Sequence, residues 1–290
     1  MIFQKIRNKE QGRTKYKLFS ITVMERIDTL FQKKIFLFGL PIYRKVKIDA
    51  LENTFEYISD QTIRLENLML RAEKAAAVSG QHTEVFKKYK GIFKNKTIVI
   101  VGSGPTLNKY KPINDAIHIG LNRAYKYEKI ELDFLFSQDI SGLKEDIKEM
   151  NAYRKGKCLK FYGYNIMRDL SIPEIDVIEA DASRYYSGGL GAPFFIDITN
   201  APLADYGSVA FAALAFALYT HPKRICLVGC DVTQNYFFPT EKKIKTDAET
   251  MMQGWHAFKT FADNVYPDIE IVSINPVGLR GLFHDEFTSE

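Results

Sequence analysis

The segment with the clearest chemical potential is a glycine-rich turn after a short apolar run, Gly102-Ser103-Gly104-Pro105-Thr106-Leu107. Glycines at the end of a strand allow a tight turn and let backbone N–H groups approach a ligand, while the start of a following helix attracts phosphate. The turn lacks the full G-x-G-x-x-G pattern and the G-K-[ST] ending of a P-loop, which disfavours a simple NAD or kinase loop. Four residues are predicted to line a nucleotide site, with a purely structural turn as the alternative: Gly102, Ser103, Gly104 and Pro105.

Polar side chains follow two further apolar stretches. Asn122 comes after the first, and Gln138 and Asp139 come after the second. In an open parallel sheet, ligands bind at the edge formed by the carboxyl ends of the strands. The amide of Asn122 can recognise a base or a ribose, and Gln138 or Asp139 can hold a sugar hydroxyl. The alternative is that Asn122 and Asp139 cap helices.

Two more segments place small or acidic residues at the same predicted edge. Gly207 and Ser208 precede an Ala-rich run over residues 209–218, whose helix start can bind an anion through its dipole and N–H groups. Asp231 follows the apolar run over residues 224–228. It can accept a hydrogen bond from the hydroxyl of an acceptor sugar, or it can make a structural hydrogen bond to a neighbouring loop.

A transfer reaction that inverts a sugar centre needs a base of near-neutral pKa, and imidazole suits that task. His256, which follows a polar loop, is the first candidate for this base among the five histidines. Asp231, Asp139 and His284 are the alternatives, and His256 can also be a packing or surface residue. Tyr236 is predicted to donate a hydrogen bond to a leaving phosphate.

Metal-ligand and disulfide patterns are missing from the chain. No D-x-D triplet follows a strand, and no cluster of His, Cys and Asp has ligand spacing, so a divalent ion is not expected to be essential. The three cysteines form an odd set without a C-x-x-C pair. This usage predicts a reduced, intracellular protein.

The residues above must be positioned by short strands that alternate with helices. Uniformly apolar runs at 97–101, 132–137, 224–228 and 269–274 are typical of buried parallel strands. Alternation with helical stretches predicts an α/β, Rossmann-like, doubly wound and mostly parallel sheet with a helical N-terminal extension. We divide the chain into three parts: a basic segment over 1–48, a helical heptad region over 49–90 and a nucleotide-sugar-binding catalytic domain over 91–290.

Length and composition agree with a folded protein. The chain has 290 residues, of which 46% are hydrophobic and 26% charged, and this excludes wholesale disorder and low-complexity sequence. No apolar run approaches the roughly 20 residues of a membrane span, and the first residues do not resemble a signal peptide. We therefore expect a cytoplasmic protein.

The net charge of +5 is unevenly distributed. Residues 1–48 hold twelve Lys or Arg and three acidic residues, a net charge of +9, so the remainder carries −4. Within this part, residues 33–43 interleave basic and apolar residues and can dock on the anionic surface of the inner membrane or on an acidic polymer. The alternative is a solvated extension, and no recognisable nucleic-acid module accompanies the charge.

A heptad seam runs through residues 51–76, with apolar residues at alternating spacings of four and three. This pattern predicts a helix that either packs along its own domain or pairs with another subunit. A homo-oligomer is therefore one of the expected partnerships.

The order of these motifs resembles the bacterial sialyltransferases of glycosyltransferase family 42 and, more distantly, the MptE-like proteins. The resemblance spans about residues 96–280 and rests on shared strand and helix contexts. Its features are Val101 to Leu107, Asn122, the Gly207-Ser208 helix start, Leu227 to Asp231 and Asn275-Pro276.

This resemblance implies a single-sheet, GT-A-like glycosyltransferase that uses a CMP-activated nonulosonic acid and inverts the anomeric centre. Residues of the glycine turn and Asn122 would bind the nucleotide, Gln138 or Asp139 would replace a second Asn of the family, and Gly207 and Ser208 would lie beside the donor. The chain departs from the family at Thr233, where the family has a Tyr that binds the donor phosphate. The family's histidine base also has no clean counterpart.

The leading hypothesis is a metal-independent transfer of sialic acid or a related sugar from a CMP-sugar to a lipooligosaccharide or capsule acceptor. The basic N-terminal part would hold the enzyme near the inner membrane. One alternative is an MptE-like diphosphokinase that uses ATP and Mg²⁺. The other is a non-catalytic nucleotide-binding scaffold, which would bind nucleotide without turnover.

Overall fold

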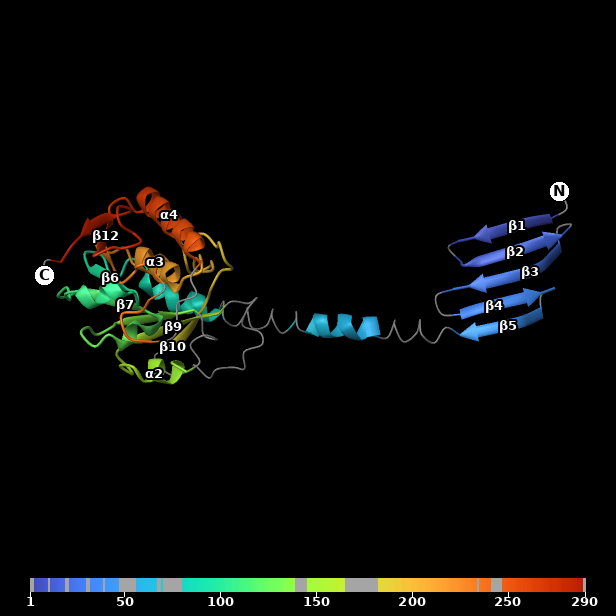
Figure 1. Cartoon of the computed structure of the whole chain (residues 1–290), viewed down its shortest axis with the longest axis horizontal. Coiled ribbons are helices and arrows are strands. Elements are labelled where there is room, and N and C mark those ends of the chain that lie inside the picture. The colour runs from blue at the N-terminus through green and yellow to red at the C-terminus, as the bar shows by residue number, and fades with distance from the viewer. Residues whose placement is uncertain are drawn as a thin grey trace. The chain divides into compact units, whose positions relative to one another are not determined.

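The computed structural model describes residues 3–9, 11–18, 21–29, 32–38, 40–46, 56–66, 69, 80–138, 145–164, 182–233, 235–240 and 247–288. The chain divides into two units, Met1–Leu70 and Arg71–Glu290 (Figure 1). Asp139, one of the predicted site residues, lies outside the described residues, as does most of the heptad seam.

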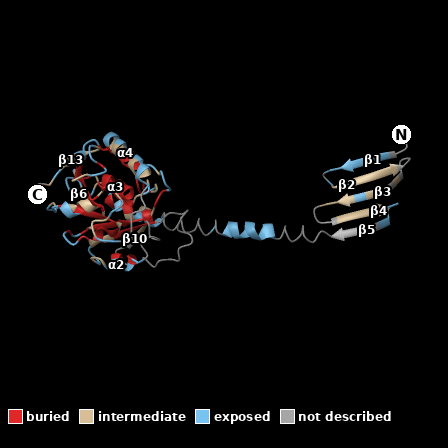
Figure 2. Cartoon of the chain, viewed as in Figure 1, coloured by how far each residue is buried: buried red, intermediate tan, exposed pale blue. Residues whose placement is uncertain are grey.

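The first unit contains a five-stranded antiparallel sheet in the order β1-β2-β3-β4-β5 (Figure 1). Its strands are β1 (Phe3–Asn8), β2 (Arg13–Leu18), β3 (Ile21–Asp28), β4 (Gln32–Leu37) and β5 (Leu40–Val46). Each residue of this unit whose burial is described is half-buried or exposed, and the helical residues 56–66 are all exposed (Figure 2). The sequence predicted a helical extension and missed this sheet, because basic residues interrupt the apolar alternation that marks a half-buried strand.

The second unit is built on an eight-stranded sheet in which every described pairing is parallel. The strands are β6 (Thr97–Val101), β7 (Ile117–Leu121), β8 (Phe134–Ser137), β9 (Leu159–Tyr164), β10 (Ala182–Tyr186), β11 (Arg224–Val228), β12 (Glu270–Ile274) and β13 (His284–Glu286). Helices flank this sheet (Figure 1), so the predicted α/β, Rossmann-like fold is confirmed. The four apolar runs singled out in the sequence all fall on strands.

The strand order of this sheet is β10-β9-β8-β7-β6-β11-β12-β13. From β6 the chain first adds strands on one side, up to β10, and then returns to add β11 on the other side. The order therefore reverses between β6 and β11, and ligands of open α/β sheets bind at such a switch point, outside the carboxyl ends of the strands.

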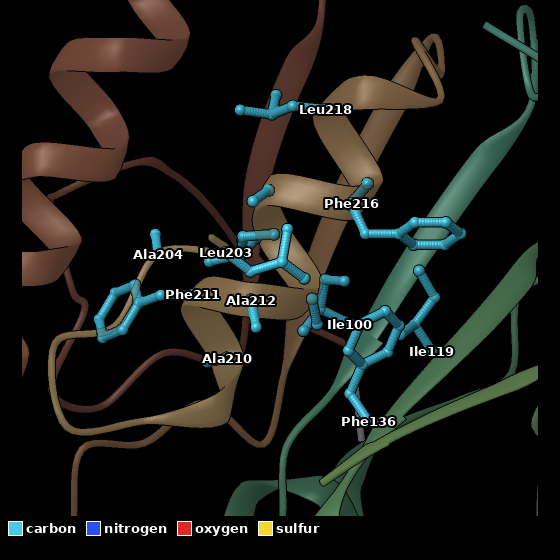
Figure 3. Packing of buried hydrophobic residues seen from close by; sticks show 14 of the residues in the cluster. Ile100, Ile119, Phe136, Leu203, Ala204, Ala210, Phe211, Ala212, Phe216 and Leu218 are labelled. Atoms are coloured by element: carbon cyan, nitrogen blue, oxygen red, sulfur yellow. The ribbon is translucent and has the colours of Figure 1, made fainter. Parts of the chain in front are cut away.

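Helix α3 (Val209–Tyr219) forms the centre of the larger core, and all of its residues are buried. It has no polar face because the sheet lies on one side and α4 (Ala248–Val265) on the other, where the rings of Phe211 and Trp255 are 5.3 Å apart. Phe216 packs close to Phe136 of β8 (Figure 3). Burying a side chain of this size contributes roughly 2–3 kcal/mol. This packing fixes the start of α3 at the carboxyl edge of the sheet.

Short helices follow the strands near the switch point. They are η2 (Pro105–Lys109) after β6, η3 (Asn122–Lys126) after β7 and α2 (Ile147–Ala152) after β8, while η1 (Lys87–Tyr89) precedes the sheet. A second core on the other face of the sheet packs under η2 and η3 and includes Val99, Leu107 and Met150. Of the helices described, none is both long enough and apolar enough to cross a membrane.

Candidate functional site

The glycine turn after β6 is fastened to the loop after β11. The N–H groups of Gly102 and Gly104 donate to the carbonyl oxygens of Val228 and Gly229, each at 2.8 Å. A Cβ on Gly102 would lie 2.3 Å from the Gly229 oxygen, so this approach requires glycine. The N–H of Ser103 has no hydrogen-bond partner within the described ranges, which makes it one available donor for a ligand.

Asp231 holds the same two loops together through its side chain. One carboxylate oxygen accepts from the Thr106 N–H at 2.8 Å, the other accepts from the Thr106 hydroxyl, and the residue is 3% exposed. Burial raises the pKa of Asp231 above its ordinary value, although the hydrogen bonds from Thr106 act in the opposite direction. This arrangement is the structural hydrogen bond to a neighbouring loop that the sequence left as an alternative.

Two predicted ligand-binding residues carry unsatisfied polar atoms. The Oδ1 of Asn122 and the Oγ1 of Thr233 are buried and have no hydrogen-bond partner in the described structure. Asn122 has a φ of +49°, and Val232, which precedes Thr233, has a φ of +52°. An unsatisfied buried polar atom costs about 1–3 kcal/mol, and a strained backbone is concentrated at functional sites. A ligand with complementary polar groups would relieve the first of these costs.

Gln138 and the start of α3 are joined by Asp205, which the sequence reasoning did not single out. Gln138 Nε2 donates to Asp205 Oδ2 at 2.6 Å, and Asp205 Oδ1 accepts from the Gly207 N–H at 2.8 Å. Ser208 is the N-cap of α3, where its Oγ accepts from Ala210 N at 3.2 Å. The carboxylate of Asp205 would repel an anionic ligand group at this helix start. The start of α3 therefore suits a neutral sugar hydroxyl better than a phosphate. The spacing Asp-x-Gly is a turn signal that could have indicated Asp205.

Tyr236 is held by Arg123, another residue that the sequence reasoning did not select. Arg123 NH1 donates to the Tyr236 hydroxyl at 3.0 Å, and its guanidinium also lies over the Tyr236 ring. Asp146 in turn binds Arg123 at 2.7 Å and Lys126 at 2.9 Å. Burial opposes ionisation of Asp146, but the two cations outweigh it and lower the pKa of this carboxyl. In this arrangement the Tyr236 oxygen accepts a hydrogen bond from Arg123, and the phenol hydrogen of Tyr236 stays available for donation to another group.

The segment that carries Tyr236 also contacts the glycine turn. The Phe237 N–H donates to the Ser103 carbonyl oxygen at 3.0 Å, and Asn108 Nδ2 donates to the Phe237 carbonyl oxygen at 2.8 Å. Ser103 Oγ also donates to the Leu121 carbonyl oxygen at the end of β7. The loops after β6, β7 and β11 therefore meet around Ser103, at the switch point between β6 and β11.

Among the described residues, no hydrogen bond or ion pair connects the candidate histidine bases with the loops after β6, β7 and β11. His256 lies on the exposed side of α4, next to the buried Gly254 and Trp255, and has no hydrogen bond or ion pair with another described residue. His284 is exposed on β13. In the described ranges there is also no group of three or more His, Cys, Asp or Glu side chains that could hold a metal ion. The identity of the base stays a prediction.

The three cysteines are free, and we expect them to be unreactive in the native protein. Cys158 and Cys226 are fully buried, and burial raises the pKa of Cys230 to about 12 and that of Cys226 to about 11. Because the thiolate is the reactive form, a thiol reagent should label no cysteine at about pH 8 and all three after denaturation. Fast labelling of one thiol in the native protein would contradict this result.

Comparison with known proteins adds a likeness of fold. No protein-family model matches the chain, and no curated protein gives a significant match. Among solved structures, the MAf glycosyltransferase from Magnetospirillum magneticum AMB-1 is similar at 15% identity and a TM-score of 0.45, over 73% of this chain and 38% of that one. The sialyltransferase CST-II, in complex with a trisaccharide acceptor and CMP, is similar at 17% identity and a TM-score of 0.40, over 61% and 80%.

A further structure of CstII, from Campylobacter jejuni in complex with the substrate analogue CMP-3FNeuAc, is similar at 16% identity with a TM-score of 0.38. That match covers 66% of this chain and 84% of the sialyltransferase. The match with the MAf glycosyltransferase covers 38% of that protein, which is well under half of its length. At these identities the likeness concerns the arrangement of strands and helices.

Proposed function

We propose that this chain is a glycosyltransferase that transfers sialic acid or a related nonulosonic acid from a CMP-sugar to a glycan or glycolipid acceptor. The observation that carries the proposal is the buried, unsatisfied Oδ1 of Asn122, which follows β7 beside the glycine turn. The order of motifs shared with family 42 supports the choice of a CMP-sugar over other activated donors. The reaction inverts the anomeric centre and does not require a divalent ion.

The nucleotide is bound at the switch point between β6 and β11. The Oδ1 of Asn122 accepts a hydrogen bond from the cytosine amino group or a ribose hydroxyl, and the Ser103 N–H donates to the phosphate. The buried hydroxyl of Thr233 takes the place of the family's phosphate-binding Tyr. In this scheme the backbone of Gly102 and Gly104 shapes the site rather than contacting the ligand, since both N–H groups bind the β11 loop.

Tyr236 stabilises the leaving group. When the bond between the anomeric carbon and the phosphate oxygen breaks, negative charge develops on the CMP phosphate. The phenol hydrogen, left available by the Arg123 hydrogen bond, is donated to that phosphate. Preorganised donors of this kind typically contribute a factor of about 10²–10³ to a rate.

The hydroxyl groups of the donor sugar, and not its carboxylate, lie beside Gly207 and Ser208, because the carboxylate of Asp205 disfavours a second anion there. The acceptor hydroxyl attacks the anomeric carbon and gives its proton to a base, for which His256 remains the first candidate. Asp231 is assigned to holding the turn, because Thr106 already occupies both of its carboxylate oxygens.

The test is a binding measurement with CMP, CMP-sialic acid, UDP, ADP and ATP, with and without Mg²⁺. We expect CMP and CMP-sialic acid to raise the melting temperature without Mg²⁺, and Asn122→Ala to weaken CMP binding about tenfold, which corresponds to one charge-assisted or buried hydrogen bond. Asn264→Ala is the matched control, since Asn264 is exposed on α4 and its side-chain amide donates to the Thr260 carbonyl oxygen of the same helix.

The proposal fails if ATP with Mg²⁺ is the selective ligand, which would favour the diphosphokinase. It also fails if CMP binds but CMP-sialic acid is neither hydrolysed nor used with any glycan acceptor, which would favour the scaffold. Equal weakening in the two Asn variants would move the nucleotide away from β7.

A further inference from the structure

The hairpin formed by β4 and β5 exposes apolar side chains at its tip. Phe38 is 69% exposed, Leu40 is 70% exposed and Leu37 is 41% exposed. In the backbone register Leu37 pairs with Leu40, so these residues lie together where the hairpin turns. Large apolar groups gathered at one exposed point mark a contact with a partner or a membrane.

Cationic residues follow immediately behind this tip. Lys33 and Lys34 lie on β4, and the register pairs them with Lys45 and Arg44 of β5. A run of basic residues along two paired strands attracts an anionic surface. The distance along the strand from Lys34 to Leu37 is about 10 Å, which matches the depth between lipid headgroups and the upper acyl chains.

The described strands of the first unit form a single sheet. Each residue from Gln4 to Leu40 whose burial is described is half-buried or exposed, so no described residue of this range covers the tip in a core. The whole segment 1–48 carries a net charge of +9. An acidic polymer in solution would neutralise the lysines but would leave Phe38 and Leu40 in water, whereas an anionic bilayer satisfies both groups.

We propose that the β4–β5 hairpin docks on an anionic lipid bilayer by inserting its apolar tip, Leu37, Phe38 and Leu40, while the basic residues that lie behind the tip along β4 and β5 attract the lipid headgroups. This inference does not depend on the transferase proposal, because it uses only residues of the first unit. It gives the unit a function of its own, which is to concentrate the chain at a membrane surface.

The first experiment is flotation of the full chain with phosphatidylcholine vesicles that contain about 30% phosphatidylglycerol. We expect binding that is lost in pure phosphatidylcholine and weakened by salt, and a loss of about tenfold in the double variant Phe38→Ser with Leu40→Ser. The matched control is Leu190→Ser with Phe287→Ser, which removes the same two residue types at exposures of 68% and 60%. That variant should bind as the wild type does.

The second experiment reports insertion directly. The chain has one tryptophan, Trp255, which is 1% exposed, so a Phe38→Trp variant adds a distinguishable fluorophore at the tip. We expect its emission to shift to the blue on anionic vesicles and to be quenched by brominated lipids, while the wild-type emission stays constant. Vesicle binding without quenching, or an unchanged affinity of the Phe38→Ser and Leu40→Ser variant, would leave only a charge interaction and overturn the proposal. Absence of any vesicle binding would overturn it as well.

Discussion

Gly104→Val is expected to lower the free energy of unfolding by about 3 kcal/mol and to abolish CMP binding. A Cβ at this position would lie 2.3 Å from Asp231 Oδ2 and 2.7 Å from the Gly229 carbonyl oxygen. Neither atom can withdraw easily, because Thr106 holds the carboxylate and the Gly104 N–H holds the carbonyl. The substitution therefore separates the loops after β6 and β11, and urea unfolding followed by calorimetric titration with CMP measures both effects.

Gly80→Val is the matched control for this variant. Apart from its chain neighbours and its own helix, a Cβ on Gly80 meets no atom of the described residues within 4 Å, so the same valine should leave the free energy of unfolding and the affinity for CMP nearly unchanged. Wild-type affinity in Gly104→Val would show that the nucleotide is bound away from the switch point. Equal destabilisation by both variants would show that the valine acts through local backbone preference instead.

Asp231→Ala should cost about 2–4 kcal/mol of stability, since it leaves the N–H and the hydroxyl of Thr106 without a buried partner. Asp231→Asn should cost less than about 1 kcal/mol, because an amide can accept from the N–H and donate to the hydroxyl. Asp263→Ala is the surface control: Asp263 makes an exposed ion pair with Lys259, and its removal should change stability by less than about 0.5 kcal/mol. Urea unfolding of the three variants measures these differences.

The same residue predicts a pH dependence with a defined sign. The pKa of Asp231 is raised in the folded protein, so the folded state binds the proton more tightly than the unfolded chain. Its contribution to stability is fully present below the ordinary pKa of 3.8 and is lost as the pH rises through the raised value. The stability of the wild type minus that of Asp231→Asn should therefore fall as the pH rises above about 4. A difference that rises with pH would mean that Thr106 stabilises the charged form more than burial opposes it.

These two variants also separate the two roles considered for Asp231. A positioning residue tolerates Asn, so donor binding and turnover would survive in Asp231→Asn and be lost in Asp231→Ala. A general base does not tolerate Asn, because the amide cannot take a proton from the acceptor hydroxyl. Turnover lost in both variants, with CMP affinity kept in Asp231→Asn, would return Asp231 to the candidates for the base.

The parallel sheet could be predicted from the sequence because its strands are buried on both faces. Uniformly apolar runs such as Thr97–Val101 and Arg224–Val228 carry that signal, and they also place the residues that follow them at one edge. The gathering of Asn122, Ser103 and Asp231 at this edge follows from the chain order alone. The sequence therefore predicted that these residues lie at one edge of the sheet, and their roles in a site stay predictions.

The partners of those residues could not be predicted in the same way. Asp231 binds Thr106 and Tyr236 binds Arg123 because separate loops meet in space, and no local pattern encodes such pairs. Asp205 had a weak signal in its spacing to Gly207. The strands of the first unit could not be predicted, because their sequences lack a regular alternation of apolar and polar residues.

The pairing of β6 with β11 has a consequence for synthesis of the chain. Thr106 and Asp231 are 125 residues apart, and at a translation rate of about 5–20 residues per second β6 waits roughly 6–25 s for its second neighbour. During that time one edge of a buried, hydrophobic strand has no partner from its own chain, which is the condition under which nascent chains aggregate or require a chaperone. Because the glycine turn needs the strand β11 and the loop after it for the hydrogen bonds of Gly102, Gly104 and Thr106, the candidate site is among the last features of the second unit to form.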